Sequence, residues 1–248
     1  MRFVPSEISA DASRPRRPLI LSLDAAGSAC SVAVARGDAV LCAEHLEMPH
    51  GQAEALLPTV DRVMRGARLE ASALDLVAVT TGPGSFTGIR VGLAAARGIV
   101  LGLDIPLFGV TSFEAVAAAC APDSAERFLL VALESRRADL FVQLFSPARH
   151  ALGDPAAVLP EALEQIVMAA IAGRPLSIAG DAAARAAAAL AGRGCASLVE
   201  DGGRAAVGAL REALRRWCQG ERGSPARPLY LRQPGVTLAP GPQRLGEP

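Results

Sequence analysis

The chain has 248 residues, 51 % of them hydrophobic. It contains no lysine, so all 25 basic side chains are arginines, and they balance 25 acidic side chains. This length and apolar content are ample for a hydrophobic core. The absence of lysine excludes a P-loop, a Schiff-base lysine and a lysine general base. A net charge of zero, with one tryptophan and one tyrosine, argues against a basic, aromatic face for tight nucleic-acid binding.

The cysteines and the termini indicate a reducing compartment. The five cysteines are odd in number, widely spaced and without a C-x-x-C pair, so we interpret them as reduced thiols. Residues 1–17 lack the pattern of a signal peptide, and no apolar run reaches the usual length of a membrane span. We therefore expect a cytoplasmic protein with no membrane association.

The first regular elements predict an antiparallel meander. After a poorly ordered lead-in over residues 1–17, apolar strands run over Leu19–Leu23, Cys30–Ala35 and Ala39–His45 and are joined by short turns. A helix over His50–Arg68 follows, and Pro58 should kink it or restart it. The apolar stripe of this helix consists of Leu56, Leu57, Val60, Val63 and Met64.

The stretch after this helix is the most informative part of the sequence. A buried strand over Leu76–Val79 ends at the Gly82–Thr87 loop, in which Ser85 or Thr87 can cap the next helix. That helix, Gly88–Leu103, is apolar on nearly every face except for two arginines that share one side. Its four glycines predict close backbone approach. Such a helix must be covered on several sides, which favours a subunit interface.

The second half is expected to be a reduced echo of the first. A strand precedes a capping box at Thr111–Glu114, which starts a helix, and a strand hairpin follows around Glu134–Arg137. The remaining expected elements are the strand Leu176–Ala179, helices over Pro160–Ala172, Asp181–Ala191 and Val207–Cys218, and a closing element over Pro228–Arg232. Together these elements predict an α/β protein with mixed sheets flanked by helices.

Three sites have both a functional and a structural interpretation. The Gly82–Thr87 loop could contact an anion or nucleotide, or it could be a turn that packs the following helix. Asp24, at a strand end, could orient a catalytic water or a metal, or it could cap a loop. Glu134 with Arg136 and Arg137 could bind a partner or form a solvated turn.

Four segments resemble the bacterial TsaB (YeaZ) family of tRNA threonylcarbamoyladenosine biosynthesis. They are Leu19–Asp24 with Ala29–Val32, Gly82–Gly92, Gly109–Ala115 and Pro228–Arg232, and the resemblance spans roughly residues 19–233. It implies a two-lobed, actin-like ASKHA (RNase H-like) fold. We expect the first lobe over residues 18–110, a smaller second lobe over 111–224, and a closing segment and loose tail over 225–248.

The resemblance also implies a role. Members of this family are non-catalytic partners of the paralogous subunit TsaD, in the machinery that places threonylcarbamoyl on adenosine 37 of ANN-reading tRNAs. TsaD would carry the metal and the chemistry, TsaE would join through the complex, and tRNA would be reached only through the complex. Without its partner, the chain is expected to form a homodimer.

The resemblance assigns no catalytic, cofactor or metal site to this chain. TsaD binds a metal through a His-x-x-x-His helix, whereas here His50 is followed by Glu54, and the other histidines are His45 and His150. One plausible ligand falls short of the three that a catalytic metal generally needs. The family commonly shows Thr-Ser-Thr after Asp24, but this chain has Ala25-Ala26-Gly27, which lacks hydroxyls for a phosphate.

The two apolar helices supply the candidate partner interface. Its residues would be Leu56, Leu57, Val60, Met64, Ile89, Arg90, Val91, Leu93 and Arg97. Two other classes of function stay open. One is an enzyme, either an actin-like ATP-dependent phosphotransferase or a peptidase of the M22 type, and the other is a direct tRNA-binding module.

Overall fold

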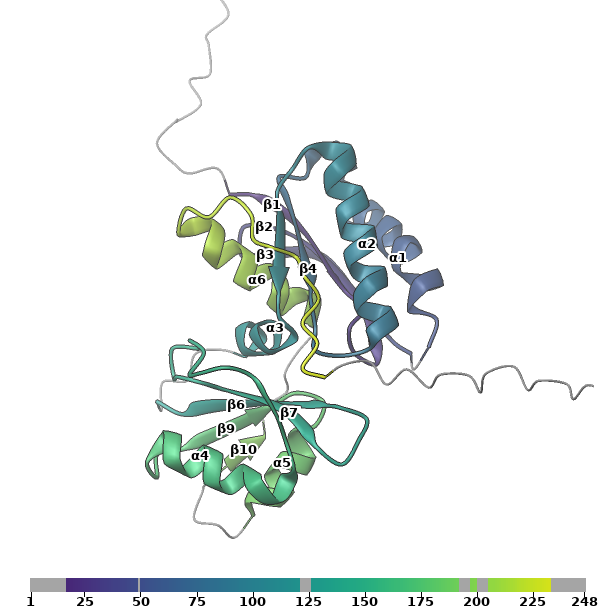
Figure 1. Ribbon diagram of the computed structural model, residues 1–248. Coiled ribbons are helices and arrows are strands. Elements are labelled where there is room, and N and C mark those ends of the chain that lie inside the picture. Colours follow the sequence, from purple (N-terminus) through teal and green to yellow (C-terminus); the bar gives the residue numbers. More distant parts are fainter. Residues whose placement is uncertain (1–16, 49, 121–125, 192–196, 200–204, 233–248) are drawn as a thin grey trace, which may run out of the picture.

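The computed structural model describes residues 17–48, 50–120, 126–191, 197–199 and 205–232. The expected lead-in, apart from Arg17, and the tail from residue 234 lie outside these ranges. Two lobes, each built on a five-stranded sheet, lie one above the other in Figure 1.

The sheet of the first lobe has the strand order β3-β2-β1-β4-β5. Its strands are β1 (Leu19–Asp24), β2 (Ala29–Arg36), β3 (Ala39–Glu47), β4 (Leu76–Thr80) and β5 (Leu107–Val110). The first three strands form the antiparallel meander, and β4 and β5 join it in parallel, with Leu23 opposite Val32 on one side and Val79 on the other. The predicted mixed sheet is therefore confirmed.

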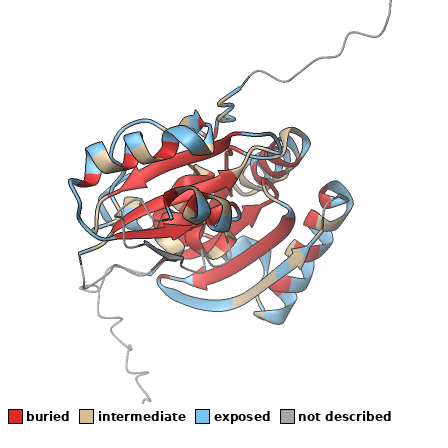
Figure 2. Ribbon diagram, turned by 90° about the horizontal axis from the view of Figure 1, so that it is seen from below, coloured by how far each residue is buried: buried red, intermediate tan, exposed pale blue. Residues whose placement is uncertain are grey.

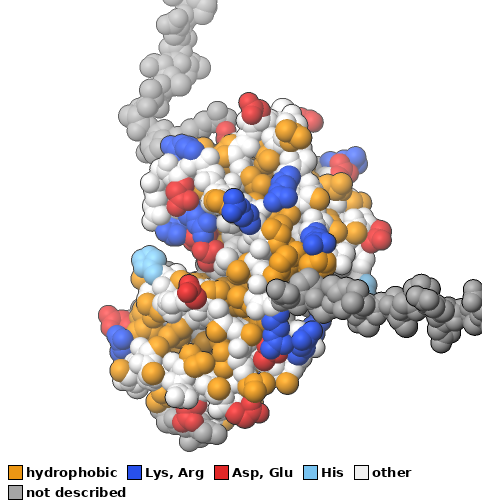
Figure 3. All heavy atoms as spheres, viewed as in Figure 1, with side chains coloured by type: hydrophobic (Ala, Val, Ile, Leu, Met, Phe, Trp, Pro, Cys, Tyr) orange, Lys and Arg blue, Asp and Glu red, His pale blue; other side chains and the backbone are white. Residues whose placement is uncertain are grey.

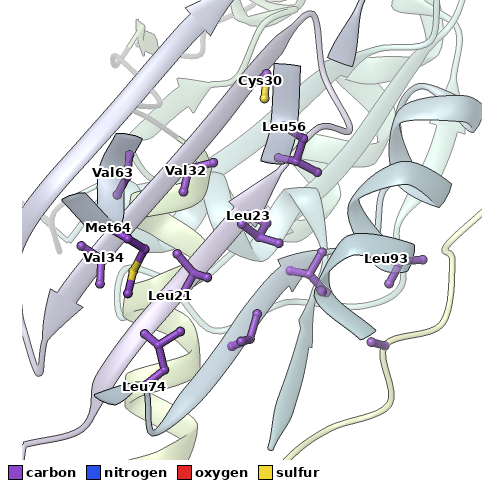
Figure 4. Close-up of a cluster of buried hydrophobic side chains, with 14 of the residues drawn as sticks. Leu21, Leu23, Cys30, Val32, Val34, Leu56, Val63, Met64, Leu74 and Leu93 are labelled. Atoms are coloured by element: carbon purple, nitrogen blue, oxygen red, sulfur yellow. The ribbon is translucent and has the colours of Figure 1, made fainter. Parts of the chain in front are cut away.

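Helices cover both faces of this sheet. One face packs against α1 (Gln52–Gly66) and α2 (Phe86–Leu103), and Figure 4 shows side chains of these helices meeting the strands in the core. The opposite face packs against α6 (Ala205–Cys218). Pro58 lies on the exposed side of α1, which runs as one helix through it, so the predicted restart does not occur.

The second sheet repeats the first in strand order, β8-β7-β6-β9-β10. Its strands are β6 (Phe128–Glu134), β7 (Leu140–Phe145), β8 (Ala156–Val158), β9 (Leu176–Ala179) and β10 (Ser197–Val199). As in the first lobe, three strands pair antiparallel and two join in parallel. The echo is thus a complete repeat, whose two outer strands, β8 and β10, the sequence did not predict.

The second sheet is covered on one face by α4 (Leu163–Ile171), which follows a 3₁₀ turn over Pro160–Ala162, and by α5 (Ala183–Leu190). Its other face meets α3 (Ser112–Ala119), which also lies against α6. This helix therefore lies between the two lobes (Figure 1). Figure 2 shows that most strands are buried, whereas the outer sides of the helices are exposed, as is much of the edge strand β3.

One helix requires a correction to the sequence analysis. By length and composition alone, α2 is long and apolar enough to cross a membrane, unlike the other helices in the described part of the chain. Its packing explains this composition differently, since Ile89, Leu93 and Ala96 are buried against the first sheet. One side of α2 serves the core of this chain, and only the other side is free.

Candidate functional site

A cleft of about 810 Å³ opens between the two lobes. Its walls come from the carboxyl end of β1, the loop between β4 and α2, the turn between β6 and β7, and residues 229–232. In the folded chain the three sites that the sequence singled out, Asp24, the Gly82–Thr87 loop and the Glu134–Arg137 turn, all contribute to this one cleft.

Asp24 lies at the floor of the cleft and is fully engaged by its own chain. One carboxylate oxygen accepts hydrogen bonds from the Thr80 hydroxyl at 2.5 Å and from the Ala26 amide at 3.2 Å. The other lies 3.5 Å from the Ser31 hydroxyl. Burial raises the pKa of Asp24, although these hydrogen bonds oppose that effect. This environment fits the loop-capping interpretation of Asp24.

The amino-terminal end of α2 is closed by the loop that follows Asp24. Ser85 caps the helix, as one of the two predicted alternatives, and its hydroxyl accepts from the Gly88 amide at 3.2 Å. The Ser85 amide donates to the Ala26 carbonyl at 2.6 Å. A Cβ atom at Gly88 would come within 1.9 Å of the Ala25 carbonyl oxygen, so only glycine permits this approach. The amides of Ser85 and Gly88 are therefore already engaged within the chain, which favours the packing interpretation of this loop.

The second lobe forms the opposite wall with a network of carboxylates. Glu134, at the end of β6, forms an ion pair with Arg185 at 2.5 Å, and its amide donates to Asp181 at 2.8 Å. Burial and the nearby Glu134 charge raise the pKa of Asp181. Arg136 and Arg137 stand exposed at the tip of this turn.

The segment Ser224–Arg232, here called the C-terminal strap, connects the two walls. It starts beside β5, where the Ser224 amide donates to the Leu107 carbonyl at 3.0 Å. It then follows α2, where Arg97 donates to the Ala226 carbonyl at 2.7 Å, and the Leu229 amide donates to Thr81 at 2.8 Å. The strap is the yellow segment that passes between α2 and β4 in Figure 1. No strand forms in the strap, so it closes the fold by individual hydrogen bonds.

The end of the strap contributes the aromatic part of the cleft. The Tyr230 ring lies 5.2 Å from the Phe86 ring, and Arg90 stacks over Phe86 at 3.7 Å while donating to the Tyr230 hydroxyl at 3.3 Å. Two residues further on, Arg232 forms an ion pair with the buried Asp139 of the second lobe. The strap thus connects the lobes, a role that sequence spacing could not reveal.

Three of the expected interface residues are core residues instead. Leu56, Ile89 and Leu93 are at most 2 % exposed in this chain alone, so they cannot meet a partner without unfolding. This corrects the expectation, which assigned whole helices to the interface without separating their two faces. Of the other candidates, Met64 is buried, Val60 and Val91 are half-buried, Leu57 is 55 % exposed, and Arg90 and Arg97 hold the C-terminal strap.

A different set of residues forms the free side of the two helices. This α1–α2 outer face comprises Leu57, Ala94, Gly98, Leu101 and Gly102. Leu101 is 86 % exposed, and a Cβ atom at Gly98 or Gly102 would meet no atom within 4 Å. Close packing therefore explains Gly88, whereas a Cβ atom at Gly92 would make ordinary contact with Val79 at 3.6 Å. Reading α2 as two faces, one with Ile89 and Leu93 and one with Leu101, would have found this set.

Metal-ligating side chains do not gather in the described residues: no three of the types His, Cys, Asp and Glu lie together there. His45 lines the cleft, where its charge slightly lowers the pKa of Asp24 against the larger effect of burial. His50 and Glu54 lie at the start of α1, and His150 lines a second cavity of about 300 Å³ next to α3 and α6.

Comparison with known proteins finds relatives that are described as tRNA-modification proteins. A family model described as TsaD, tRNA N6-adenosine threonylcarbamoyltransferase, matches residues 48–147. The tRNA threonylcarbamoyladenosine biosynthesis protein TsaB of Escherichia coli is 30 % identical over 123 residues, which are 49 % of this chain and 52 % of that protein. The chain therefore spans about half the length of the curated TsaB relatives that it matches.

Three further matches cover more of the chain. An uncharacterized protein of Mycobacterium tuberculosis is 31 % identical over 151 residues, which cover 57 % of this chain and 69 % of that protein. The solved structure of YeaZ from Pseudomonas aeruginosa superimposes with a TM-score of 0.73 at 23 % identity, over 86 % of this chain and all of that one. A polyphosphate/ATP-glucomannokinase of Arthrobacter, at 11 % identity and a TM-score of 0.51, covers 81 % of this chain and 99 % of its own and shares the two-lobed fold. The predicted actin-like architecture is confirmed.

Proposed function

Because the chain belongs to the TsaB (YeaZ) family, we propose that it acts in tRNA threonylcarbamoyladenosine biosynthesis as a non-catalytic subunit. In this proposal it pairs with a TsaD-type subunit and activates it, and the partner modifies adenosine 37 of ANN-reading tRNAs. TsaE would join through the pair. The proposed location is the cytoplasm.

The observation that carries the pairing is the α1–α2 outer face. Leu101 is 86 % exposed, and Gly98 and Gly102 near it on α2 carry no side chain, so this apolar surface would gain free energy if another apolar surface covered it. Residues without bulky side chains also let a second helix come close. Both properties suit an interface between helices, in which Leu101 would be the central contact.

The cleft supports the non-catalytic part of the proposal. Asp24, the one carboxylate at the end of β1, accepts hydrogen bonds from Thr80, Ala26 and Ser31. At the start of α2, the Ser85 amide donates to the Ala26 carbonyl and the Gly88 amide donates to the Ser85 hydroxyl. Groups that are satisfied in this way are poorly placed to bind and activate a nucleotide.

The test compares two exposed leucines in binding to a purified TsaD-type subunit. Leu101→Arg places a charge at the centre of the proposed interface and should weaken association about 10-fold or more. Leu159→Arg alters a leucine that is 53 % exposed but lies on the second lobe, so association should stay at the parent level. Equal association of Leu101→Arg and the parent would contradict the pairing.

The same face would join two copies when the partner is absent. The proposed homodimer is tested by light scattering at micromolar concentration, which should give a dimer for the parent and a monomer for Leu101→Arg. A parent chain that remains monomeric would exclude self-association through this face, whereas the pairing with TsaD has its own test above.

A further inference from the structure

The mouth of the cleft brings together side chains that lie far apart in the sequence. We call Phe86, Arg90, Arg136, Arg137 and Tyr230 the arginine–aromatic rim. All but Arg90 line the cleft directly, and Arg90 contacts both aromatic rings. Figure 3 shows basic side chains on both lobes beside the gap between them. The rim therefore combines positive charge with aromatic surface at one place.

Two arginines of the rim, Arg136 and Arg137, are available to bind an anion, while Arg90 is engaged with the two aromatic rings. In the described part of the chain, Arg90, Arg136 and Arg137 have no carboxylate within ion-pair distance. Arg136 and Arg137 are exposed at the tip of the β6–β7 turn. An exposed guanidinium without a carboxylate partner is well suited to bind a phosphate with two parallel hydrogen bonds.

The acidic residues near the rim have partners within the chain. Glu134 is paired with Arg185, and Asp139 is paired with Arg232. Asp181 accepts the Glu134 amide, and its pKa is raised by burial while the nearby Arg136 charge opposes that shift. The cleft lining carries Arg136, Arg137 and Arg232 against Asp24, Glu134 and Asp181, and of these arginines Arg136 and Arg137 are the ones exposed at the tip of the β6–β7 turn.

The aromatic pair offers a stacking surface beside these arginines. Tyr230 remains 37 % exposed while its ring packs on Phe86, and Arg90 fixes both by stacking on one and donating to the other. A ring that is held in place but open on one side can stack with a nucleobase at little entropic cost. The chain's only tyrosine lies here.

We propose that the arginine–aromatic rim binds a single-stranded stretch of RNA, with phosphates on Arg136 and Arg137 and a base stacked on Tyr230. The inference rests on the proposed function, since tRNA is the RNA that the complex would handle. An acidic peptide could pair its carboxylates with the arginines, but it would not need the Phe86–Tyr230 aromatic pair. A free nucleoside triphosphate would offer the rim both phosphates and a base, so ATP binding is one outcome of the test.

The test measures binding of a labelled, unmodified tRNA transcript by fluorescence anisotropy over a series of salt concentrations, with the full chain alone and in complex with the TsaD-type subunit. Each phosphate contact contributes about 0.7 to the slope of log K against log salt for a single strand. Changing Arg136 and Arg137 to alanine together should therefore lower the slope by about 1.4. Arg17→Ala, which alters an exposed arginine paired with Asp38, is the matched control and should leave the slope unchanged.

A second pair of variants tests the stacking. Tyr230→Ala should weaken binding about 5- to 150-fold, the range for one stacked base. Tyr230→Phe keeps the ring and should bind nearly as the parent does. Unchanged affinity and slope in the Arg136/Arg137 variant, equal loss in Tyr230→Phe and Tyr230→Ala, or no RNA binding by the parent in either form would overturn the inference. So would ATP binding to the rim with no RNA binding.

Failure of this inference can be told apart from failure of the proposed function. Association with the TsaD-type subunit, measured with the same variants, depends on the α1–α2 outer face and should not change. If the variants still associate with the TsaD-type subunit and their RNA affinity and salt slope equal those of the parent, only the inference fails. If association never occurs in the parent, the proposed function fails as well.

Discussion

The start of α2 provides the sharpest test of how this chain packs. A Cβ atom at Gly88 would lie 1.9 Å from the Ala25 carbonyl oxygen, about 1.5 Å short of ordinary contact, and backbone atoms cannot turn aside as a side chain can. Gly88→Ala therefore has to displace the loop that follows Asp24. Strain of this kind typically costs about 1–3 kcal/mol.

The matched control lies on the same helix. A Cβ atom at Gly98 would meet nothing within 4 Å, so Gly98→Ala should gain only the helix propensity of alanine, about 1 kcal/mol. For a chain of this size, about 1 kcal/mol shifts Tm by roughly 2–4 °C. Thermal unfolding should thus show Tm lowered by about 2–12 °C for Gly88→Ala and raised by about 2–4 °C for Gly98→Ala.

The two variants must move in opposite directions for the reasoning to hold. They make the same chemical change in one helix, so only the surroundings differ. A Gly88→Ala variant as stable as the parent would show that the loop over α2 yields easily. A Gly98→Ala variant that loses stability at the same protein concentration would show that the α1–α2 outer face is already covered.

Two carboxylates predict opposite dependences of stability on pH. The folded pKa of Asp24 is raised by burial, so its contribution is fully present below the ordinary value of 3.8 and is lost as pH rises through the folded pKa. Asp24→Asn keeps an acceptor for the Thr80 hydroxyl. Its free energy of unfolding in urea, relative to that of the parent, should therefore rise between acid and neutral pH. A difference between the two proteins that stays constant with pH would contradict this. Burial would raise the pKa of Glu212, but bonds from Arg215 and Arg216 lower it overall. The contribution of Glu212 to the free energy of unfolding is present above the ordinary pKa of 4.5 and is lost as pH falls through the folded pKa. Glu212→Gln should therefore lower the free energy of unfolding by about 1–3 kcal/mol at pH 7 and by much less in strong acid. An equal loss at both pH values would refute the pairing with the two arginines.

Local sequence signals predicted the fold well wherever a single residue type decides the structure. Ser85 caps α2 because its hydroxyl is placed to accept the Gly88 amide, and the capping box at Thr111 and Glu114 starts α3. Both follow from chemistry within four residues. The mixed first sheet followed from strand lengths and from the helices between the parallel strands.

Features that depend on distant contacts could not be predicted in the same way. The three-residue strands β8 and β10 are too short to show a period and exist because a neighbouring strand pairs with them. The composition argument against nucleic acid counted charges over the whole chain. It could not show that acids such as Asp139 are paired, whereas Arg136 and Arg137 are left exposed at the cleft.

The most direct measurement of the central claim is the yield of threonylcarbamoyladenosine on an ANN-reading tRNA transcript, determined by mass spectrometry. The reaction would contain the TsaD-type subunit and its accessory factors, with this chain, with Leu101→Arg, or without it. The account predicts a high yield with the parent chain, and little product with Leu101→Arg or when the chain is omitted. Full yield without the chain, or product formed by the chain in the absence of the TsaD-type subunit, would contradict it.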